Sequence, residues 1–224
     1  MILGLTGRKR SGKSTVARHL VDNLGFRELS FAARLKRMAA DVNPMVHYID
    51  TRNLSDTDRE LLANGVTPGP VYLLDALRVL GEERAKDALP EVRRFYQRLG
   101  TEGVRDNLGD TVWVDLVDSQ IEEIRAEDLR AQLEARGTPG APVPPRTPLV
   151  LADVRFENEA DLIRGWGGLV VEIRRPSQGD PADGHSSEAG VRADHVVENV
   201  EGDPSVMIAA VTRLLLENPS RRQP

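Results

Sequence analysis

Gly7-Arg8-Lys9-Arg10-Ser11-Gly12-Lys13-Ser14 is the stretch that decides the fold of this chain. It matches the pattern G-x-x-x-x-G-K-[ST] in full, between a short apolar run at residues 2–6 and helical apolar spacing over residues 14–24. The glycines allow a tight turn in which several backbone N–H groups point at one anion. The helix that follows adds the positive end of its dipole. The stretch therefore predicts a phosphate-binding loop between a buried strand and a helix.

Each residue type that this pattern requires has a role in binding a nucleotide. Lys13 can reach the β- and γ-phosphates, and the Ser14 hydroxyl can bind magnesium. We therefore expect ATP and Mg²⁺ as ligands. The expected ATP-binding residues of the loop are Gly7, Arg10, Ser11, Gly12, Lys13, Ser14 and Thr15. By residue usage, such a pattern arises by chance in roughly one chain in a hundred of this length, and its place between strand and helix makes chance a weaker explanation.

The rest of the chain alternates short apolar runs with helical patterns. Further strands are predicted at residues 26–31, 149–154, 169–173 and 195–197. Helices are predicted at residues 32–42, 71–80, 110–136, 158–164 and 204–216. Alternation of this kind predicts a parallel sheet with helices on both faces. The predicted fold class is α/β, a three-layer α/β/α fold with a roughly five-stranded parallel sheet.

Composition limits the classes of partner. The chain has 224 residues, a net charge of −5, a hydrophobic share of 40% and no cysteine. The absence of cysteine excludes disulfides and thiolate metal sites. The acidic balance argues against general attraction to nucleic acid or to an anionic membrane, so a phosphate site must be local. No run of 18 apolar residues occurs, and we expect a cytoplasmic protein.

A second carboxylate is needed to hold magnesium beside the loop, and it usually follows a neighbouring strand. Asp153 ends the apolar run that begins at Leu149 and is the candidate. An ordinary turn-forming aspartate is the alternative. Arg155 lies two residues on, on the same side of an extended chain, where it could touch phosphate or pair with Asp153.

Other P-loop classes lack support in the sequence. There is no Asn-Lys-x-Asp motif of the kind GTPases use to read guanine, and no Leu-Ser-Gly-Gly-Gln transporter signature. The chain is also short for a remodelling ATPase. A small kinase remains as the interpretation that these observations favour.

The sequence resembles the bacteriophage-type deoxynucleoside monophosphate kinases, within the adenylate-kinase-like group. The matching segments span nearly the whole chain. They are residues 7–15, Phe31 to Lys36, Gln97 to Arg105, Asp153 to Glu159, Arg174-Arg175-Pro176, His185 to Glu188 and Ala193 to Asn199.

The resemblance implies roles for residues outside the phosphate loop. The catalytic set would be Lys13, Arg155, Arg174 and Arg175, with Ser14 and Asp153 on the metal. Asn199 would lie beside the adenine of ATP. The acceptor nucleotide would contact Phe31, Arg34, Lys36, Arg98, Thr101, Glu102 and Arg105. Asn158 and Glu159 are expected to cap the following helix rather than to bind a ligand.

The resemblance also implies a domain organisation. We expect one P-loop kinase domain over residues 1–224, with a core at about 1–42 and 148–217. A helical acceptor-binding insertion would occupy about 43–136 and a lid about 176–190. The composition of the Pro-rich segment 137–148 indicates a surface linker. The partners would be ATP and a deoxynucleoside monophosphate, with no nucleic acid or membrane, for a monomer or homodimer located in the host cytoplasm if the chain is phage-encoded.

The function implied is ATP-dependent phosphorylation of deoxynucleoside monophosphates to diphosphates, which supplies precursors for DNA synthesis. Three alternatives stay open. The first is another small-molecule P-loop kinase, of the dephospho-coenzyme A or shikimate type. The second is a nucleotide-switch ATPase that transfers phosphate to no acceptor. The third, a nucleic-acid-binding protein, is disfavoured by the net charge.

Overall fold

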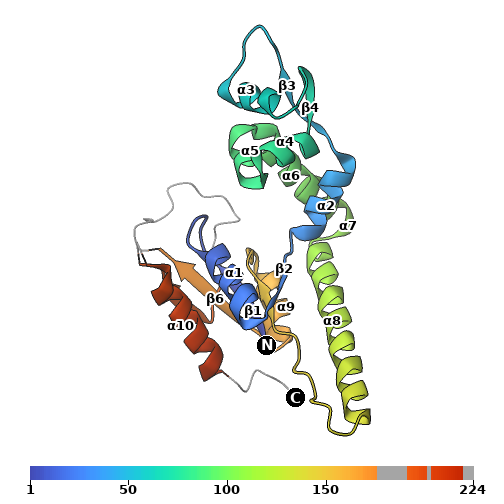
Figure 1. The fold of residues 1–224 in the computed structure, drawn as a ribbon, viewed down its shortest axis with the longest axis vertical. Coiled ribbons are helices and arrows are strands. Elements are labelled where there is room, and N and C mark those ends of the chain that lie inside the picture. The colour runs from blue at the N-terminus through green and yellow to red at the C-terminus, as the bar shows by residue number, and fades with distance from the viewer. Residues whose placement is uncertain (176–190, 201–202, 219–224) are drawn as a thin grey trace. The chain divides into compact units, whose positions relative to one another are not determined.

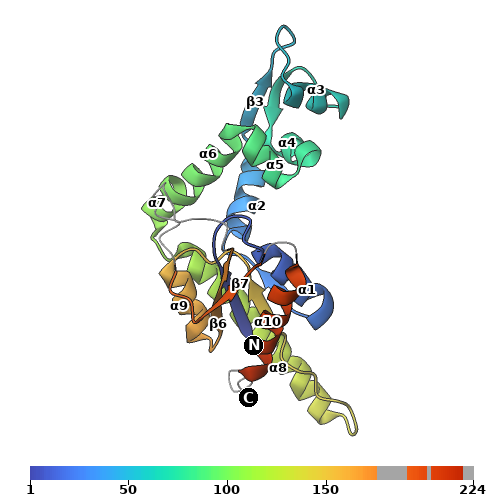
Figure 2. The same cartoon turned by 90° about the vertical axis from the view of Figure 1, so that its left-hand side faces the viewer.

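A computed structural model describes residues 1–175, 191–200 and 203–218 of the chain. The chain forms two compact units (Figures 1 and 2). The first unit contains Met1–Phe31 and Trp113–Pro224, and the second contains Ala32–Val112. The expected lid at 176–190 lies outside the described residues. None of the helices in the described part combines the length and apolar character needed to span a bilayer.

The first unit is built on a parallel sheet of five strands in the order β2-β5-β1-β6-β7. Their bounds are β1 Ile2–Thr6, β2 Arg27–Leu29, β5 Leu149–Leu151, β6 Leu169–Arg174 and β7 His195–Glu198. The central strand β1 pairs in parallel with β5 on one side and β6 on the other. The five strands predicted from sequence are confirmed, and the phosphate loop leaves the carboxyl end of the central one.

Helices cover both faces of this sheet. Helices α1 (Lys13–Leu24) and α10 (Pro204–Glu217) pack on one face, where their apolar side chains join Leu3 and Leu5 in one core. Helices α8 (Val112–Gly137) and α9 (Glu157–Gly165) pack on the other, where they join Ile2 and Val170 in a second core. Alternate residues of β1 therefore serve opposite cores, as strand geometry requires. The three-layer α/β/α fold is confirmed.

The Pro-rich segment is tied to helix α8. The Arg125 guanidinium donates to the Thr147 carbonyl at 2.8 Å, and the Asp128 carboxylate accepts from the Thr147 hydroxyl at 2.6 Å. Farther along the helix, the Gln132 amide donates to the Pro144 carbonyl at 3.1 Å. The segment thus returns alongside the helix and delivers the chain to β5.

The second unit combines helices with a small antiparallel sheet. Its strands are β3 (Met45–Ile49) and β4 (Gly69–Tyr72), which pair with each other. Its helices are α2 Ala33–Val42, α3 Asp56–Ala63, α4 Leu73–Leu80, α5 Glu82–Ala88, α6 Pro90–Arg98, the π-helix η1 Leu99–Arg105 and α7 Asp106–Leu108. They enclose a separate core that includes Val46, Ile49, Leu61 and Val71.

The bounds and content of this unit differ from the helical insertion expected at about 43–136. Helix α2 belongs to the second unit, because Ala39 packs into its core. Most of α8 belongs to the first unit, because Val117, Ile121 and Ile124 pack beneath the sheet. The β3–β4 pair was not predicted, since the turn-forming residues around it hide a strand of only five residues.

Asp58 fixes the start of helix α3 in the second unit. Its carboxylate accepts from the Ser55 backbone N–H at 2.8 Å and from the Ser55 hydroxyl at 2.7 Å, while the Ser55 hydroxyl accepts from the Asp58 N–H. The His47 Nε2 lies 2.6 Å from the other Asp58 oxygen, which ties the cap to β3. Burial would raise the pKa of Asp58, but the bonds from Ser55 and His47 outweigh it and hold that pKa below its ordinary value.

Replacing Asp58 by Ala should therefore lower the free energy of unfolding by about 1–3 kcal/mol, because a helix cap and buried hydrogen bonds are lost. Asp56→Ala, at a fully exposed carboxylate two residues earlier in the same helix, should change it by less than about 0.5 kcal/mol. Urea unfolding at neutral pH measures both.

The sign of the pH dependence is fixed by the lowered pKa. The carboxylate contributes its stabilisation above the unfolded pKa of about 4 and loses it as the pH falls through the lower folded value. The difference between wild type and Asp58→Ala should shrink as the pH falls below about 4. A difference that grew on acidification would contradict this account of the cap.

Candidate nucleotide-binding site

The loop between β1 and α1 has a backbone that only glycine accepts at its two ends. Gly7 has φ 130° and Gly12 has φ 113°. A Cβ atom on Gly7 would lie 2.3 Å from the Ile173 carbonyl oxygen, and one on Gly12 would lie 2.7 Å from the Asn199 side-chain nitrogen. Arg10 also has a positive φ, 65°, which is uncommon for a residue with a side chain. The strained turn is the one that the sequence pattern predicts for an anion cradle.

Lys13, the first residue of α1, folds its side chain back over the loop. Its ammonium donates to the Gly7 carbonyl at 2.6 Å and to the Arg8 carbonyl at 2.7 Å. Burial and the nearby Arg155 guanidinium lower the pKa of Lys13 to about 8, and the Asp153 carboxylate opposes this shift. Lys13, Arg155 and Asp153 are therefore electrostatic neighbours. An anion placed at the loop would favour the charged form of the amine.

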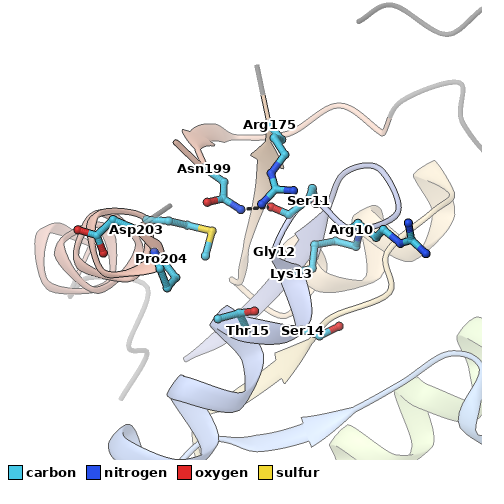
Figure 3. Close-up of a pocket in the computed structure, with 11 residues that line it drawn as sticks. Arg10, Ser11, Gly12, Lys13, Ser14, Thr15, Arg175, Asn199, Asp203 and Pro204 are labelled. Carbon is cyan, nitrogen blue, oxygen red and sulfur yellow. Dashed lines mark hydrogen bonds between the residues drawn. The ribbon is translucent and has the colours of Figure 1, made fainter. Parts of the chain in front are cut away.

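Asn199 supports the loop from the other side. It is 6% exposed, and its side-chain amide donates to the Ser11 carbonyl at 2.7 Å (Figure 3). Its backbone N–H donates to the Arg174 carbonyl at 2.7 Å. Asn199 thus links the phosphate loop to the end of β6. Its predicted position beside adenine stays a prediction.

A pocket of about 450 Å³ opens beside the loop (Figure 3). The loop lines one wall of this pocket. Lining residues are Arg10, Ser11, Gly12, Lys13, Ser14, Thr15, Arg175, Asn199, Asp203, Pro204 and Met207. Sequence reasoning missed Asp203, Pro204 and Met207. A helix start at Pro204 was predicted, but nothing in the sequence pairs that helix end with the loop.

The two arginines at the end of β6 are separated by the structure. Arg174 is exposed and forms an ion pair with Glu172 at 2.8 Å, two residues back on the same strand. Arg175 lines the pocket, and within the described residues its Nε is buried without a hydrogen-bond partner. Because β-strand residues alternate, only one of an adjacent pair can face the loop. Arg175 is the better candidate for contact with phosphate.

Asp153 lies just beyond β5 and accepts a hydrogen bond from the Ser30 hydroxyl, at 2.5 Å. Arg155 is exposed, and its backbone N–H donates to the buried Glu159 carboxylate at 2.7 Å. Glu159 also accepts from the Phe156 N–H at 3.2 Å at the start of α9. The expected capping role of Glu159 is confirmed, whereas Asn158 lies inside the first turn of the helix.

The oxygen donors present suit Mg²⁺ bound together with a nucleotide. Ser14 offers a hydroxyl beside the loop, and Asp153 offers a carboxylate that is electrostatically coupled to Lys13. Among the described residues, no cluster of three or more His, Asp or Glu side chains could hold a metal by itself. Mg²⁺ commonly binds proteins through one or two oxygens and completes its shell with phosphate and water. This donor set fits that mode.

The residues predicted to bind the acceptor fall on several elements. Phe31 is 5% exposed and packs in the core of the first unit, so it anchors the chain there. The others lie in the second unit. Arg34 and Lys36 are on α2, Arg98 ends α6, and Thr101, Glu102 and Arg105 are on η1.

Helices α2 and η1 lie close together within the second unit. A Cβ on Gly100 of η1 would be 3.2 Å from the Leu35 side chain of α2. Arg98 pairs with Glu102 at 3.1 Å, and Lys36 pairs with Glu82 at 3.0 Å. A π-helix of this kind frequently marks a functional position. Helices α2 and η1, which carry five of the seven candidate acceptor residues, are therefore neighbours, whereas Phe31 lies in the first unit.

The fold and the loop define the class of this protein. A parallel α/β/α sheet whose central strand leads through a G-x-x-x-x-G-K-S loop into a helix is the arrangement of P-loop proteins. Residues 83–206, more than half of the chain, match the family model described as deoxynucleotide monophosphate kinase. The chain belongs to this family of nucleotide kinases.

Individual proteins also resemble the chain. A protein of Acanthamoeba polyphaga mimivirus, named "Putative deoxynucleotide monophosphate kinase", is 28% identical over 202 residues, which cover 86% of this chain and 83% of the relative. The crystal structure of TT1252 from Thermus thermophilus matches over 97% of both chains, with 18% identity and a TM-score of 0.36. The family assignment rests on the family model.

Asn199→Ala should weaken ADP binding roughly tenfold, because the Ser11 carbonyl loses its buried donor at a cost of about 1–3 kcal/mol. Asn218→Ala removes a similar amide bond at the far end of α10, to the Leu214 carbonyl, and should leave affinity unchanged. Calorimetric titration with ADP compares the two variants. Equal affinities would show that Asn199 does not support the loop.

Proposed function

We propose that this protein catalyses ATP- and magnesium-dependent transfer of a phosphoryl group to deoxynucleoside monophosphates. The products would be ADP and the deoxynucleoside diphosphate, a precursor for DNA synthesis. The observation that carries the proposal is the glycine-bounded loop with Lys13 folded over it, in a chain that belongs to the deoxynucleotide monophosphate kinase family.

The donor phosphates would occupy the loop. Its backbone N–H groups and the start of α1 favour negative charge there. In this interpretation the Lys13 ammonium exchanges the Gly7 and Arg8 carbonyls for phosphate oxygens. The pocket beside the loop would receive the nucleoside part of ATP, against Met207 and Pro204.

Phosphoryl transfer requires the protein to position the two substrates and to neutralise their charge. An acceptor phosphate is already ionised at neutral pH, so transfer needs no strong general base. Lys13, Arg155 and Arg175 would neutralise the charge that spreads over the transferring group. Arginine suits this role because its planar guanidinium contacts two phosphate oxygens at once. Exclusion of water would favour transfer over hydrolysis.

Ser14 and Asp153 would hold the metal. When bound, Mg²⁺ supplies Lewis-acid stabilisation of charge on the phosphate oxygens. The acceptor would bind to α2, the end of α6 and η1, where Arg34, Lys36, Arg98 and Arg105 offer positive charge.

A coupled ADP-release assay with ATP and Mg²⁺ tests the proposal. The acceptor panel would contain deoxy- and ribonucleoside monophosphates, dephospho-coenzyme A, shikimate and no acceptor. We expect stimulation by deoxynucleoside monophosphates. If only dephospho-coenzyme A or shikimate stimulates ADP release, the acceptor is not a deoxynucleoside monophosphate. If the rate of ADP release is the same with every acceptor and with none, the protein is a switch-type ATPase.

Lys13→Ala should reduce phosphoryl transfer at least about 100-fold, as expected for loss of a charge that stabilises the transition state. The circular dichroism spectrum and the unfolding midpoint should be retained. Lys9→Ala changes an exposed lysine of the same loop and should retain most of the activity. Equal activity of the two variants would overturn the assignment of the loop.

Arg98→Ala should raise KM for the acceptor about tenfold, because a charged contact to phosphate contributes about 1.5–3 kcal/mol. KM for ATP should not change. Arg94→Ala, one turn earlier on α6 and likewise in an exposed ion pair with a glutamate, is the matched control. Initial rates at varied acceptor concentration give KM for both variants. An equal rise in acceptor KM in Arg98→Ala and Arg94→Ala would show that Arg98 does not bind the acceptor.

A further inference from the structure

Ser30 is a polar residue between two buried hydrophobic anchors. It follows the last residue of β2, Leu29, which is 8% exposed, and precedes Phe31, which is 5% exposed. Both neighbours pack in the core beneath β5. The parallel pairing of Leu29 with Leu151 brings the ends of β2 and β5 together. The backbone of Ser30 is therefore held firmly beside the turn that carries Asp153.

The Ser30 hydroxyl donates a hydrogen bond to the Oδ2 atom of Asp153, at 2.5 Å. A hydroxyl is a neutral donor, so it fixes the carboxylate group while leaving the negative charge in place. The phosphate-loop pattern does not include Ser30. The partner of Ser30, Asp153, is 123 residues away in the chain. Nothing in the sequence pairs the two residues.

The electrostatic surroundings explain why a neutral donor is useful there. The Asp153 carboxylate interacts with the Lys13 ammonium strongly enough to oppose the shift in the lysine pKa. A direct ion pair between these side chains would occupy the metal carboxylate and the phosphate-binding cation together. In the structure Lys13 donates instead to the Gly7 and Arg8 carbonyls, and Asp153 accepts from Ser30.

We propose that Ser30 is a positioning residue, which holds the Asp153 carboxylate in the orientation that receives magnesium bound to the nucleotide. The inference rests on the proposed function, because it takes Asp153 as a metal ligand. Residues that orient a metal ligand by a hydrogen bond typically change metal affinity about 10–100-fold when removed. Ser30 itself would touch neither nucleotide nor metal.

The test is a titration of the full chain with Mn²⁺ at saturating ADP, in which electron paramagnetic resonance measures free Mn²⁺. Ser30→Ala should weaken Mn²⁺ binding about 10–100-fold. Ser30→Thr, which keeps the hydroxyl, should stay within about threefold of wild type, since the donor is retained. Ser119→Ala, which removes an exposed serine hydroxyl on α8, should have no effect. Urea unfolding shows whether each variant is folded. If Ser30→Ala is not folded, Ser30→Cys takes its place, because a thiol is a weaker donor of similar size.

Asp153→Asn separates failure of this inference from failure of the proposed metal site. If Asp153→Asn binds Mn²⁺ as wild type does, Asp153 is not a ligand, and the inference falls together with that part of the proposed function. If Asp153→Asn loses Mn²⁺ but Ser30→Ala retains it, the positioning role alone is overturned. Equal losses in Ser30→Thr and Ser30→Ala would also overturn it, because the effect would then come from packing.

Discussion

The contact between the phosphate loop and the β7–α10 connection is the constraint on which the rest of the site depends. The loop must turn tightly enough to expose its N–H groups, and Gly12 lies where a Cβ would meet both Asn199 and Met207. Asn199 then donates to the Ser11 carbonyl. One contact region thereby fixes the loop, the start of α10 and the pocket between them. Helices α1 and α10, which follow the two connections, pack on the same face of the sheet, so the hydrophobic core on that face supports the contact.

Lys13 and Asp153 are oppositely charged neighbours beside this loop. Lys13 is held by carbonyl oxygens and Asp153 by a hydroxyl. The carbonyl partners of Lys13 are neutral, and exchanging them for phosphate should cost less than separating a buried ion pair, which leaves an uncompensated charge. The same logic distinguishes Arg175, which faces the pocket, from Arg174, which is already paired with Glu172.

Much of the first unit could be predicted from sequence, because its signals are local. Strands of the parallel sheet are continuous apolar runs, and the loop pattern fixes where β1 ends and α1 begins. The second unit was predicted less well. Strand β3 has only five residues, of which Met45 and Tyr48 are exposed, and its partner β4 is part of a turn-rich stretch. The short helices there depend on packing around Leu61 and Val71, which local patterns do not reveal.

Within the site, the residues found from sequence are those that belong to the loop or follow a strand. Ser30, Met207 and Asp203 were missed because their roles come from contacts between segments far apart in the chain. The Asn199 side chain bonds to the Ser11 backbone carbonyl, and the Ser30 side chain bonds to the Asp153 side chain. Both bonds join residues far apart in the chain, and a single sequence carries no signal for such pairs.

In the proposed reaction, phosphate moves to a nucleotide acceptor rather than to water. The most direct measurement follows the label from γ-³²P-ATP in a reaction with Mg²⁺ and a deoxynucleoside monophosphate, with the products separated by chromatography. We expect the label to appear in the deoxynucleoside diphosphate, with little inorganic phosphate. Label found only in inorganic phosphate, whatever the acceptor, would contradict it.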